Sequence, residues 1–428
     1  MHIKITDTKE KIDYVIYFIS TLTSAILSFY IIKLIVQNFG TEIYGEFTIQ
    51  FNTILIFLSL GYTWINQSVT RYDDFSMYFK VNSYLIFIFT SIFIFAIFII
   101  FILFNKGAIN LLPLYFGIFF VFAFLSFHIN LFQSRRKSRI PQLFDFSKSI
   151  FYLLFILFFI HFKCFEVKYI LTSILLSGLI PIFIFMRREI MLGFLLLKKI
   201  LSKGDILQWL VHSRQLILSF FKHGLSLGVW IALASALNTV DRIIITSSLG
   251  ALRAGSYSAG YDLINKPLAM CTLPLIIIGT PKLREYWKSG DSDRYKKTII
   301  NSTYFLFIMT MLYLVFLFFF QYLITNMGFE LLNFKMNVYL ILGSFFFNAA
   351  IFWQKYLEFS GRQFLMIIII LVCLITNASL NFIFIDLYGL EAACFITMFT
   401  SFVYLLSVII FSRPQNYLVV SKNPDSLL

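Results

Sequence analysis

The sequence predicts an all-α integral membrane protein with about twelve transmembrane helices in two six-helix lobes around a central cavity. Of its 428 residues, 59% are hydrophobic and 13% are charged, whereas an average soluble domain carries about 25% charged residues. A soluble chain of this composition could not cover its surface with polar side chains. Long apolar runs also recur along the whole chain, so lipid must be its main solvent.

Each apolar run is long enough to cross a bilayer, which takes roughly 20 residues in a helix. Lipid offers the backbone no hydrogen-bonding partner, and this requirement makes the spans helical. We expect the spans at residues 13–36, 43–68, 81–104, 109–133, 142–161, 167–187, 221–249, 255–281, 299–325, 336–357, 362–385 and 389–412.

The orientation follows from the basic residues. Most of the 35 Lys and Arg residues fall in alternate connecting segments, and such segments face the cytoplasm. Residues 1–11 are polar and basic and lead into a span without a small-residue cleavage site, so they form a cytoplasmic tail. Both termini are therefore expected in the cytoplasm. The same bias explains the formal net charge of +14, and we expect no nucleic-acid partner.

No pattern in the sequence indicates a cofactor, a metal or an enzyme. The cysteines are far apart and form no CxxC or Cys/His cluster, which argues against zinc and against disulfides. No P-loop, dinucleotide fingerprint or nucleophile elbow is present. If transport is driven, the sequence predicts an ion gradient, the membrane potential or consumption of the product as its source.

The domain prediction is an N-terminal lobe at 1–187, a basic cytoplasmic linker at 188–220 and a C-terminal lobe at 221–428. The linker contains an apolar stretch, Ile190–Leu197, that is too short to span a membrane. It is typical of an amphipathic helix at the interface.

A repeated motif supports the two lobes. The segment GTEIYGEF (40–47) and the segment GALRAGSY (250–257) both read G-x4-G-x-aromatic. Glycine suits a tight turn because it accepts positive φ. Shifting the sequence by the distance between these two segments also aligns span one with span seven. This alignment predicts parallel repeats with a substrate path between them.

Span seven carries a stripe of small and then polar residues on one face. Gly224 and Gly228 predict close helix packing, and Asn238 continues the stripe to Arg242, with Asp241 beside it. Arg242 lies about 12 Å below the end of the helix. Two interpretations remain open for Arg242, a role in a cavity and a structural ion pair.

Span eight carries Asp262 and Lys266 one helical turn apart, with Lys266 about 17 Å from the helix end. We hypothesise that Arg242 meets Asp262 across spans seven and eight, because the two lie at similar depth. The alternative is an Asp262–Lys266 pair within one helix. Pro267 and two later prolines predict a kinked helix whose freed carbonyl groups need partners from elsewhere.

Spans one and two provide further candidates. Asn66 belongs to a polar face of span two that is typical of a cavity wall. Arg71 lies at the cytoplasmic end of this span and is either a cavity residue or an interface anchor. Lys33 lies near the outer end of span one, where it either snorkels to the interface or contributes to the cavity.

The motif text resembles the polysaccharide flippases, the O-antigen and capsule-repeat transporters of the multidrug/oligosaccharidyl-lipid/polysaccharide exporter superfamily. The most specific part is the Asp241-Arg242 pair followed by a glycine turn and a helix that starts Gly-Ser-Tyr-Ser-Ala-Gly-Tyr. Recognisable motif text covers about 40–72 and 222–286. One departure is His223-Gly224-Leu225, where several relatives have a proline.

The resemblance implies a flippase that moves a polyprenyl-pyrophosphate-linked oligosaccharide across the bacterial cytoplasmic (inner) membrane, for lipopolysaccharide or capsule assembly. It implies a cationic cavity, for which Arg242, Lys266, Arg71 and Lys33 are the candidates. The polar and ion-pairing candidates are Asp241, Asp262, Asn238 and Asn66. A polysaccharide polymerase and a chain-length regulator are the expected protein partners.

Two other functions remain open. An ion-coupled exporter of drugs or organic cations in the same superfamily would need acidic residues that face the cavity. A membrane polysaccharide polymerase would need a large outer loop, whereas the expected outer loops are short.

Overall fold

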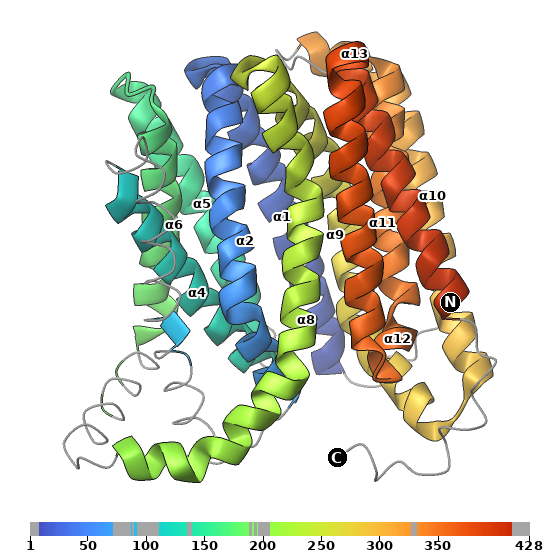
Figure 1. The fold of residues 1–428 in the computed structure, drawn as a ribbon. Coiled ribbons are helices and arrows are strands. Elements are labelled where there is room, and N and C mark those ends of the chain that lie inside the picture. The colour runs from blue at the N-terminus through green and yellow to red at the C-terminus, as the bar shows by residue number, and fades with distance from the viewer. Residues whose placement is uncertain are drawn as a thin grey trace. The chain divides into compact units, whose positions relative to one another are not determined.

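The computed structural model describes residues 8–71, 111–134, 139–187, 206–326 and 332–412, together with Phe87, Thr90, Ser91, Met191 and Leu195. Within these ranges every regular element is a helix (Figure 1). The helices are α1 (Thr8–Phe39), α2 (Thr41–Arg71), α4 (Leu112–Ser134), α5 (Arg139–His161), α6 (Val167–Phe185), α8 (Ile206–Leu249), α9 (Ala251–Ser289), α10 (Ser292–Asn326), α11 (Phe334–Trp353), α12 (Lys355–Phe359) and α13 (Gln363–Phe411).

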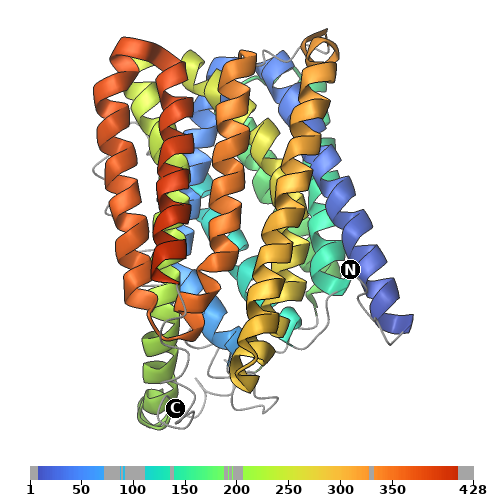
Figure 2. The same cartoon turned by 90° about the vertical axis from the view of Figure 1, so that its right-hand side faces the viewer.

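In the described part of the chain, nine helices are long and apolar enough to cross a membrane. One of them, α13, leaves helical geometry at Gly389 (φ 61°, ψ −143°) and so consists of two arms, which lie side by side in Figure 2. Another helix, α9, is less apolar but has 39 residues and packs on α10 and α11. The chain is therefore a multi-pass membrane protein, as predicted.

Eleven of the twelve predicted spans correspond to these helices. The span expected at 81–104 lies outside the described residues apart from three positions. The predicted interfacial helix at Ile190–Leu197 also lies almost entirely outside them. From Ile206 onward the expected linker is already part of α8.

The two repeated glycine motifs form equivalent turns. Gly40 (φ 96°) separates α1 from α2, and Gly250 (φ 85°) separates α8 from α9. The carbonyl of each glycine accepts a hydrogen bond from the backbone N–H four residues later, in Tyr44 and in Ala254, at 3.2 Å in both cases. The predicted positive φ at these glycines is confirmed.

The chain forms two compact units, Met1–Ala236 (unit 1) and Leu237–Leu428 (unit 2), and the division falls within α8. The predicted lobes at 1–187 and 221–428 stay a prediction. Each unit is described on its own below.

In unit 1, α1 packs on α5, α5 on α6, and α4 on both α2 and α6. A core cluster forms around Phe144 of α5, with Val121 and Leu125 of α4. Gly178 lets α6 approach α4, because a Cβ atom at this position would lie 2.6 Å from Val121 Cγ1. Small residues at such crossings are a common way to pack membrane helices.

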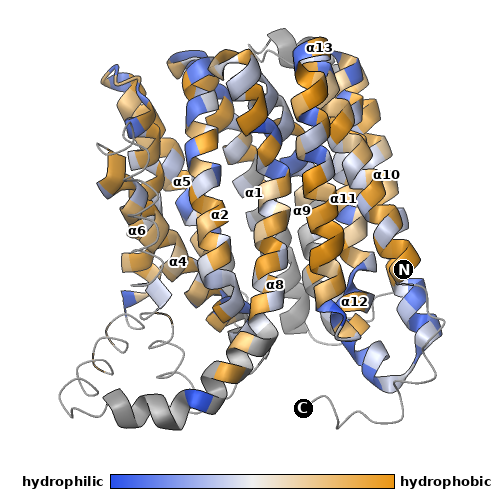
Figure 3. Ribbon diagram, viewed as in Figure 1, coloured by the Kyte–Doolittle hydropathy of each residue, from blue (hydrophilic) through white to orange (hydrophobic). Residues whose placement is uncertain are grey.

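In unit 2, α11 packs along α13, and α9, α10 and α11 contact one another. Gly343 of α11 sits directly against the backbone of α13, where a Cβ atom would lie 3.1 Å from the Met398 Cα. The outer face of α13 carries apolar side chains such as Phe382, 75% exposed, and Phe364, 73% exposed. The spans are correspondingly apolar in Figure 3, as lipid contact requires.

Candidate functional site

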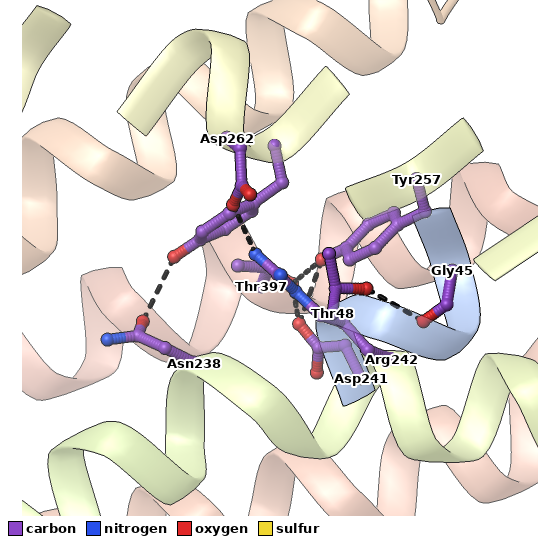
Figure 4. Close-up of polar contacts among 9 residues, drawn as sticks. Gly45, Thr48, Asn238, Asp241, Arg242, Tyr257, Asp262 and Thr397 are labelled. Carbon is purple, nitrogen blue, oxygen red and sulfur yellow. Dashed lines mark hydrogen bonds and ion pairs between the residues drawn. The ribbon is translucent and has the colours of Figure 1, made fainter. Parts of the chain in front are cut away.

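A buried carboxylate is the centre of one polar cluster in unit 2. Asp241 of α8 is 2% exposed and lies about 14 Å along the helix from its end at Gly250. Three neutral groups donate hydrogen bonds to it: Tyr257 Oη to Oδ2 at 2.9 Å, Thr397 Oγ1 to Oδ2 at 2.5 Å, and Asn381 Nδ2 to Oδ1 at 2.9 Å. Figure 4 shows the first two contacts.

The donors come from three membrane segments other than α8. Tyr257 lies on α9, whereas Asn381 and Thr397 lie on the two arms of α13, before and after Gly389. The carboxylate of Asp241 therefore joins four segments of unit 2 through hydrogen bonds. In a low-dielectric surrounding such bonds matter more than in water.

Two further polar residues extend this cluster along α13. Asn381 Nδ2 also lies 2.9 Å from Asn377 Oδ1, and Asn377 donates to Thr400 Oγ1 at 3.1 Å. The Asn381 Oδ1 atom is buried without a hydrogen-bond partner. A buried acceptor of this kind is costly unless a cation or a donor reaches it.

We name the residues Asp241, Tyr257, Asn377, Asn381 and Thr397 the carboxylate cluster. Only Asp241 was a candidate from the sequence. Three of the others could have been found as polar residues within apolar runs. Asn377 and Asn381 lie one helical turn apart in one such run, and Thr397 lies in the next apolar run.

The predicted meeting of Arg242 and Asp262 is confirmed. Arg242 of α8 is 4% exposed, and its Nη2 atom lies 2.6 Å from Asp262 Oδ1 of α9 (Figure 4). The guanidinium also lies 5.1 Å from the centre of the Tyr261 ring, which is a cation–π contact. Tyr261 in turn donates to Asn238 Oδ1 at 3.0 Å. The predicted residues Asn238, Arg242 and Asp262 therefore form one connected group.

Lys266 follows Asp262 by one turn of α9 and is half-buried. The Asp262 carboxylate therefore has a guanidinium on one side and an ammonium one turn away. Because Arg242 binds the Asp262 carboxylate, Lys266 is not its only basic neighbour, and the predicted pairing of Asp262 with Lys266 stays a prediction.

The remaining candidates belong to unit 1. Asn66 of α2 is 4% exposed and donates to Ser126 Oγ of α4 at 2.7 Å, so it joins two helices. Lys33 is half-buried on α1. Arg71 is the last residue of α2, and its side chain lies outside the described part. The roles predicted for these three residues stay predictions.

The predicted partner for a carbonyl freed by proline is present at Pro267. This residue has no N–H to donate to the carbonyl of Leu263, four residues earlier. Tyr313 of α10 donates its hydroxyl to this carbonyl at 3.1 Å instead. The Tyr313 hydroxyl thus supplies the hydrogen bond that the α9 backbone lacks at the turn that carries Asp262 and Lys266.

No family model matches the chain, and no curated protein matches it by sequence. Solved structures match it over nearly its whole length. One is the inward-facing conformation of a multidrug resistance MATE family transporter of the MOP superfamily, with a TM-score of 0.65, 13% identity, and 93% of this chain and 97% of that chain covered.

Two further structures have similar agreement. A mutant MATE transporter from Vibrio cholerae has a TM-score of 0.59 at 12% identity, covering 96% of this chain and 99% of that one. A MOP superfamily transporter from Pyrococcus furiosus, described as having a binding pocket of reverse polarity that suggests a different function, has a TM-score of 0.60 at 12% identity, covering 94% and 95%. These likenesses show that the chain has the all-helical fold of the MATE-like membrane transporters.

Proposed function

We propose that this chain is a secondary transporter driven by a monovalent cation, Na⁺ or H⁺, that binds at the carboxylate cluster. The observation that carries the proposal is Asp241, a carboxylate 2% exposed inside a membrane helix and hydrogen-bonded by neutral donors. A charged group in this position is expensive, and such groups usually mark an ion or proton pathway.

The charge and the ligand types favour a monovalent ion. The cluster offers oxygen atoms from a carboxylate, two amides and two hydroxyls, and one carboxylate balances a single positive charge. Ca²⁺ typically takes 6–8 oxygen ligands that include several carboxylates. Among the described residues, no three His, Cys, Asp or Glu side chains group together.

The unpartnered oxygen of Asn381 suggests how the cluster exchanges a hydrogen bond for an ion. Its Nδ2 now donates to Asp241 at 2.9 Å, while its Oδ1 atom is buried without a partner. Rotation of the amide would bring Oδ1 toward the carboxylate, where the two oxygens bind the same cation. Ion binding would then change the contacts between α8 and both arms of α13, which suits alternating access.

The preferred substrate is a small amphipathic solute such as an organic cation. The MATE family structure with a TM-score of 0.65 is described as a multidrug resistance transporter. In unit 2, the negative charges of Asp241 and Asp262 also balance the positive charges of Arg242 and Lys266, so these four residues together do not favour an anionic substrate. Arg242 in particular is already bound to a carboxylate at 2.6 Å.

A lipid-linked oligosaccharide is the second candidate substrate, and Lys266 is the observation that favours it. Arg242 and Lys266 share the single carboxylate of Asp262, which leaves this trio with one positive charge. A pyrophosphate head group would be attracted to that charge. The reverse-polarity pocket named for the Pyrococcus furiosus transporter supports the idea that this fold hosts more than one pocket chemistry.

The first test is cation binding by the purified protein. We expect Na⁺ or acidic pH, but not K⁺, to raise the melting temperature of the wild type, and we expect Asp241→Asn to abolish the effect. Asp386→Asn is the matched control, because Asp386 is an exposed carboxylate on the same helix as Asn381. An equal response of both variants would contradict the cation site.

The second test identifies the substrate. Proteoliposomes with an imposed Na⁺ or pH gradient are supplied with either a fluorescent organic cation or a polyprenyl-pyrophosphate-linked oligosaccharide. Gradient-driven movement of the organic cation that is lost in Asp241→Asn supports the preferred substrate. Movement of the lipid-linked sugar alone, with sensitivity to Lys266→Gln, establishes the second candidate. Failure of both substrates despite cation binding would reject both substrate classes.

A further inference from the structure

The bend that joins α9 to α10 carries an unusual density of exposed positive charge. We name residues 282–297 the basic elbow. Its exposed basic side chains are Lys282, Arg284, Lys288, Arg294, Lys296 and Lys297. The elbow is hydrophilic in Figure 3, at the end of two membrane-spanning helices.

The backbone fixes the geometry of this bend. Gly290 adopts the left-handed conformation (φ 72°), and the N–H of Asp291 reaches the carbonyl of Tyr286 at 3.0 Å, as in the Schellman motif that ends many helices. Asp291 Oδ1 then accepts from the N–H of Arg294 at 3.0 Å and caps α10. The two helix ends therefore meet in one defined arrangement.

Buried side chains attach the elbow to the rest of unit 2. Leu283 is 1% exposed and Tyr295 is 2% exposed. The Trp287 ring packs edge-on against Tyr356 of α12, with 5.3 Å between the ring centroids, and lies tilted against Tyr295, with 6.0 Å between the centroids. The exposed basic residues lie between these buried residues in the sequence. Because the buried side chains fix the elbow to unit 2, the basic side chains point away from it.

The elbow remains positive after its acidic residues are counted. Six basic and three acidic side chains (Glu285, Asp291 and Asp293) leave a formal charge of +3. Arg294 is bound to Asp291 at 3.2 Å, so the excess positive charge lies on other basic residues of the elbow, such as Lys282, Arg284 and Lys288.

The surface next to these cations is apolar. Along α10, which continues from the elbow, the exposed side chains include Ile300 (53%), Tyr304 (65%) and Leu312 (58%). A molecule with an anionic head and apolar tails matches both surfaces at once. A soluble acidic protein would match only the charges.

We propose that the basic elbow binds the head groups of anionic phospholipids, whose acyl chains lie along the exposed apolar face of α10. Clusters of Lys and Arg at the end of a membrane helix attract anionic lipid, and added salt screens the attraction. The proposal does not depend on the transported substrate or on the carboxylate cluster.

The test measures lipid preference with the full-length protein in mixtures of phosphatidylcholine and phosphatidylglycerol. Native mass spectrometry counts how many molecules of each lipid remain bound. We expect the wild type to retain phosphatidylglycerol preferentially. The triple variant Lys282→Gln/Arg284→Gln/Lys288→Gln should lose affinity for this lipid by roughly a hundredfold, since each charge near an anionic surface contributes roughly a factor of five.

The matched control removes three exposed charges elsewhere, in the variant Lys163→Gln/Arg253→Gln/Lys335→Gln. Arg253 and Lys335 are the useful comparisons, because they lie at the start of α9 and at the start of α11 rather than at the elbow. This control should keep the preference. Equal loss in both triple variants, or no preference in the wild type, would overturn the proposal.

A charge-preserving variant covers the case in which the triple variant does not fold. Lys282→Arg/Lys288→Arg should keep the lipid preference, and the preference of the wild type should fall as NaCl is raised. Lipid binding that ignores salt would refute an electrostatic head-group site. Preferential binding of an acidic soluble peptide over phosphatidylglycerol would also refute it.

Discussion

Gly224 should tolerate no larger residue, because α8 touches the backbone of α2 at this point. A Cβ atom at Gly224 would lie 2.0 Å from the Trp64 carbonyl oxygen and 2.5 Å from Ser68 Oγ. The closest ordinary contact between carbon and oxygen is about 3.3 Å. The Gly224→Ala variant therefore needs a retreat of about 1.3 Å between the two helices.

The expected cost follows from this displacement. Overpacking of this kind typically costs about 1–3 kcal/mol, and a backbone oxygen cannot rotate away as a side chain can. Alanine gains about 1 kcal/mol over glycine in helix propensity. The rigid obstacle favours the upper end of this range, about 3 kcal/mol, and subtraction of the propensity gain leaves an expected loss of about 2 kcal/mol of unfolding free energy for Gly224→Ala.

Gly279→Ala is the matched control, since Gly279 is also helical but a Cβ atom added there would have no neighbouring atom within 4 Å. It should be neutral or stabilising by up to about 1 kcal/mol. The stability of Gly228→Ala should lie between those of the other two variants, because its Cβ atom would lie 3.0 Å from the backbone nitrogen of Trp64. The measurement is unfolding in mixed SDS and dodecyl maltoside micelles, followed by circular dichroism. Equal stability of Gly224→Ala and Gly279→Ala would refute the close contact.

The other predictions concern unit 2. Arg242→Gln and Asp262→Asn should each cost about 3 kcal/mol of unfolding free energy, whereas the double variant should recover most of it, as a double-mutant cycle in the same micelles would show; additive losses would contradict the pair. Tyr313→Phe should cost about 1–2 kcal/mol, because it leaves the carbonyl freed by proline unsatisfied, and Tyr304→Phe on the exposed face of α10 should change little. Thr397→Val should lower the affinity for the cation at least tenfold, as measured by binding of the radioactive isotope, and Thr397→Ser should keep the affinity of the wild type. Unchanged affinity in Thr397→Val would show that this hydroxyl does not belong to the site.

Much of the fold could be predicted because membrane helices follow simple rules. Length and hydropathy gave the spans, and the glycine motifs gave the turns. Those turns also provided a reference from which depth in the helix could be counted at about 1.5 Å per residue. The pairing of Arg242 with Asp262 followed from that count, because residues on either side of one turn at equal depth are neighbours.

The carboxylate cluster could not be assembled in the same way. Its contacts join residues 140 and 156 positions apart, from Asp241 to Asn381 and to Thr397. No turn connects α8 to α13 directly, so depth counting gave no relation between them. The asparagines on α13 were visible as polar residues in an apolar run, but their partner depends on which helices pack together.

The contact of Arg242 with Asp262 also depends on tertiary structure. A lysine one turn away on the same helix predicts a local pair, which contributes only about 0.2–0.5 kcal/mol in an isolated helix. The guanidinium of Arg242 lies 5.1 Å from the centre of the Tyr261 ring, and Tyr261 donates a hydrogen bond to Asn238. This preorganisation reduces the entropy that Arg242 loses on binding the carboxylate.

The two adjacent charges on α8 therefore have different kinds of partners, and this difference bears on how an ion could act. Arg242 is balanced by a carboxylate at 2.6 Å, whereas Asp241 is stabilised by dipoles from Tyr257, Asn381 and Thr397. Binding a cation at Asp241 would change the net charge of the cluster without breaking the ion pair. The Arg242→Gln/Asp262→Asn double variant should consequently still bind the cation. Loss of binding in that folded variant would show that the ion pair and the carboxylate cluster act as one site.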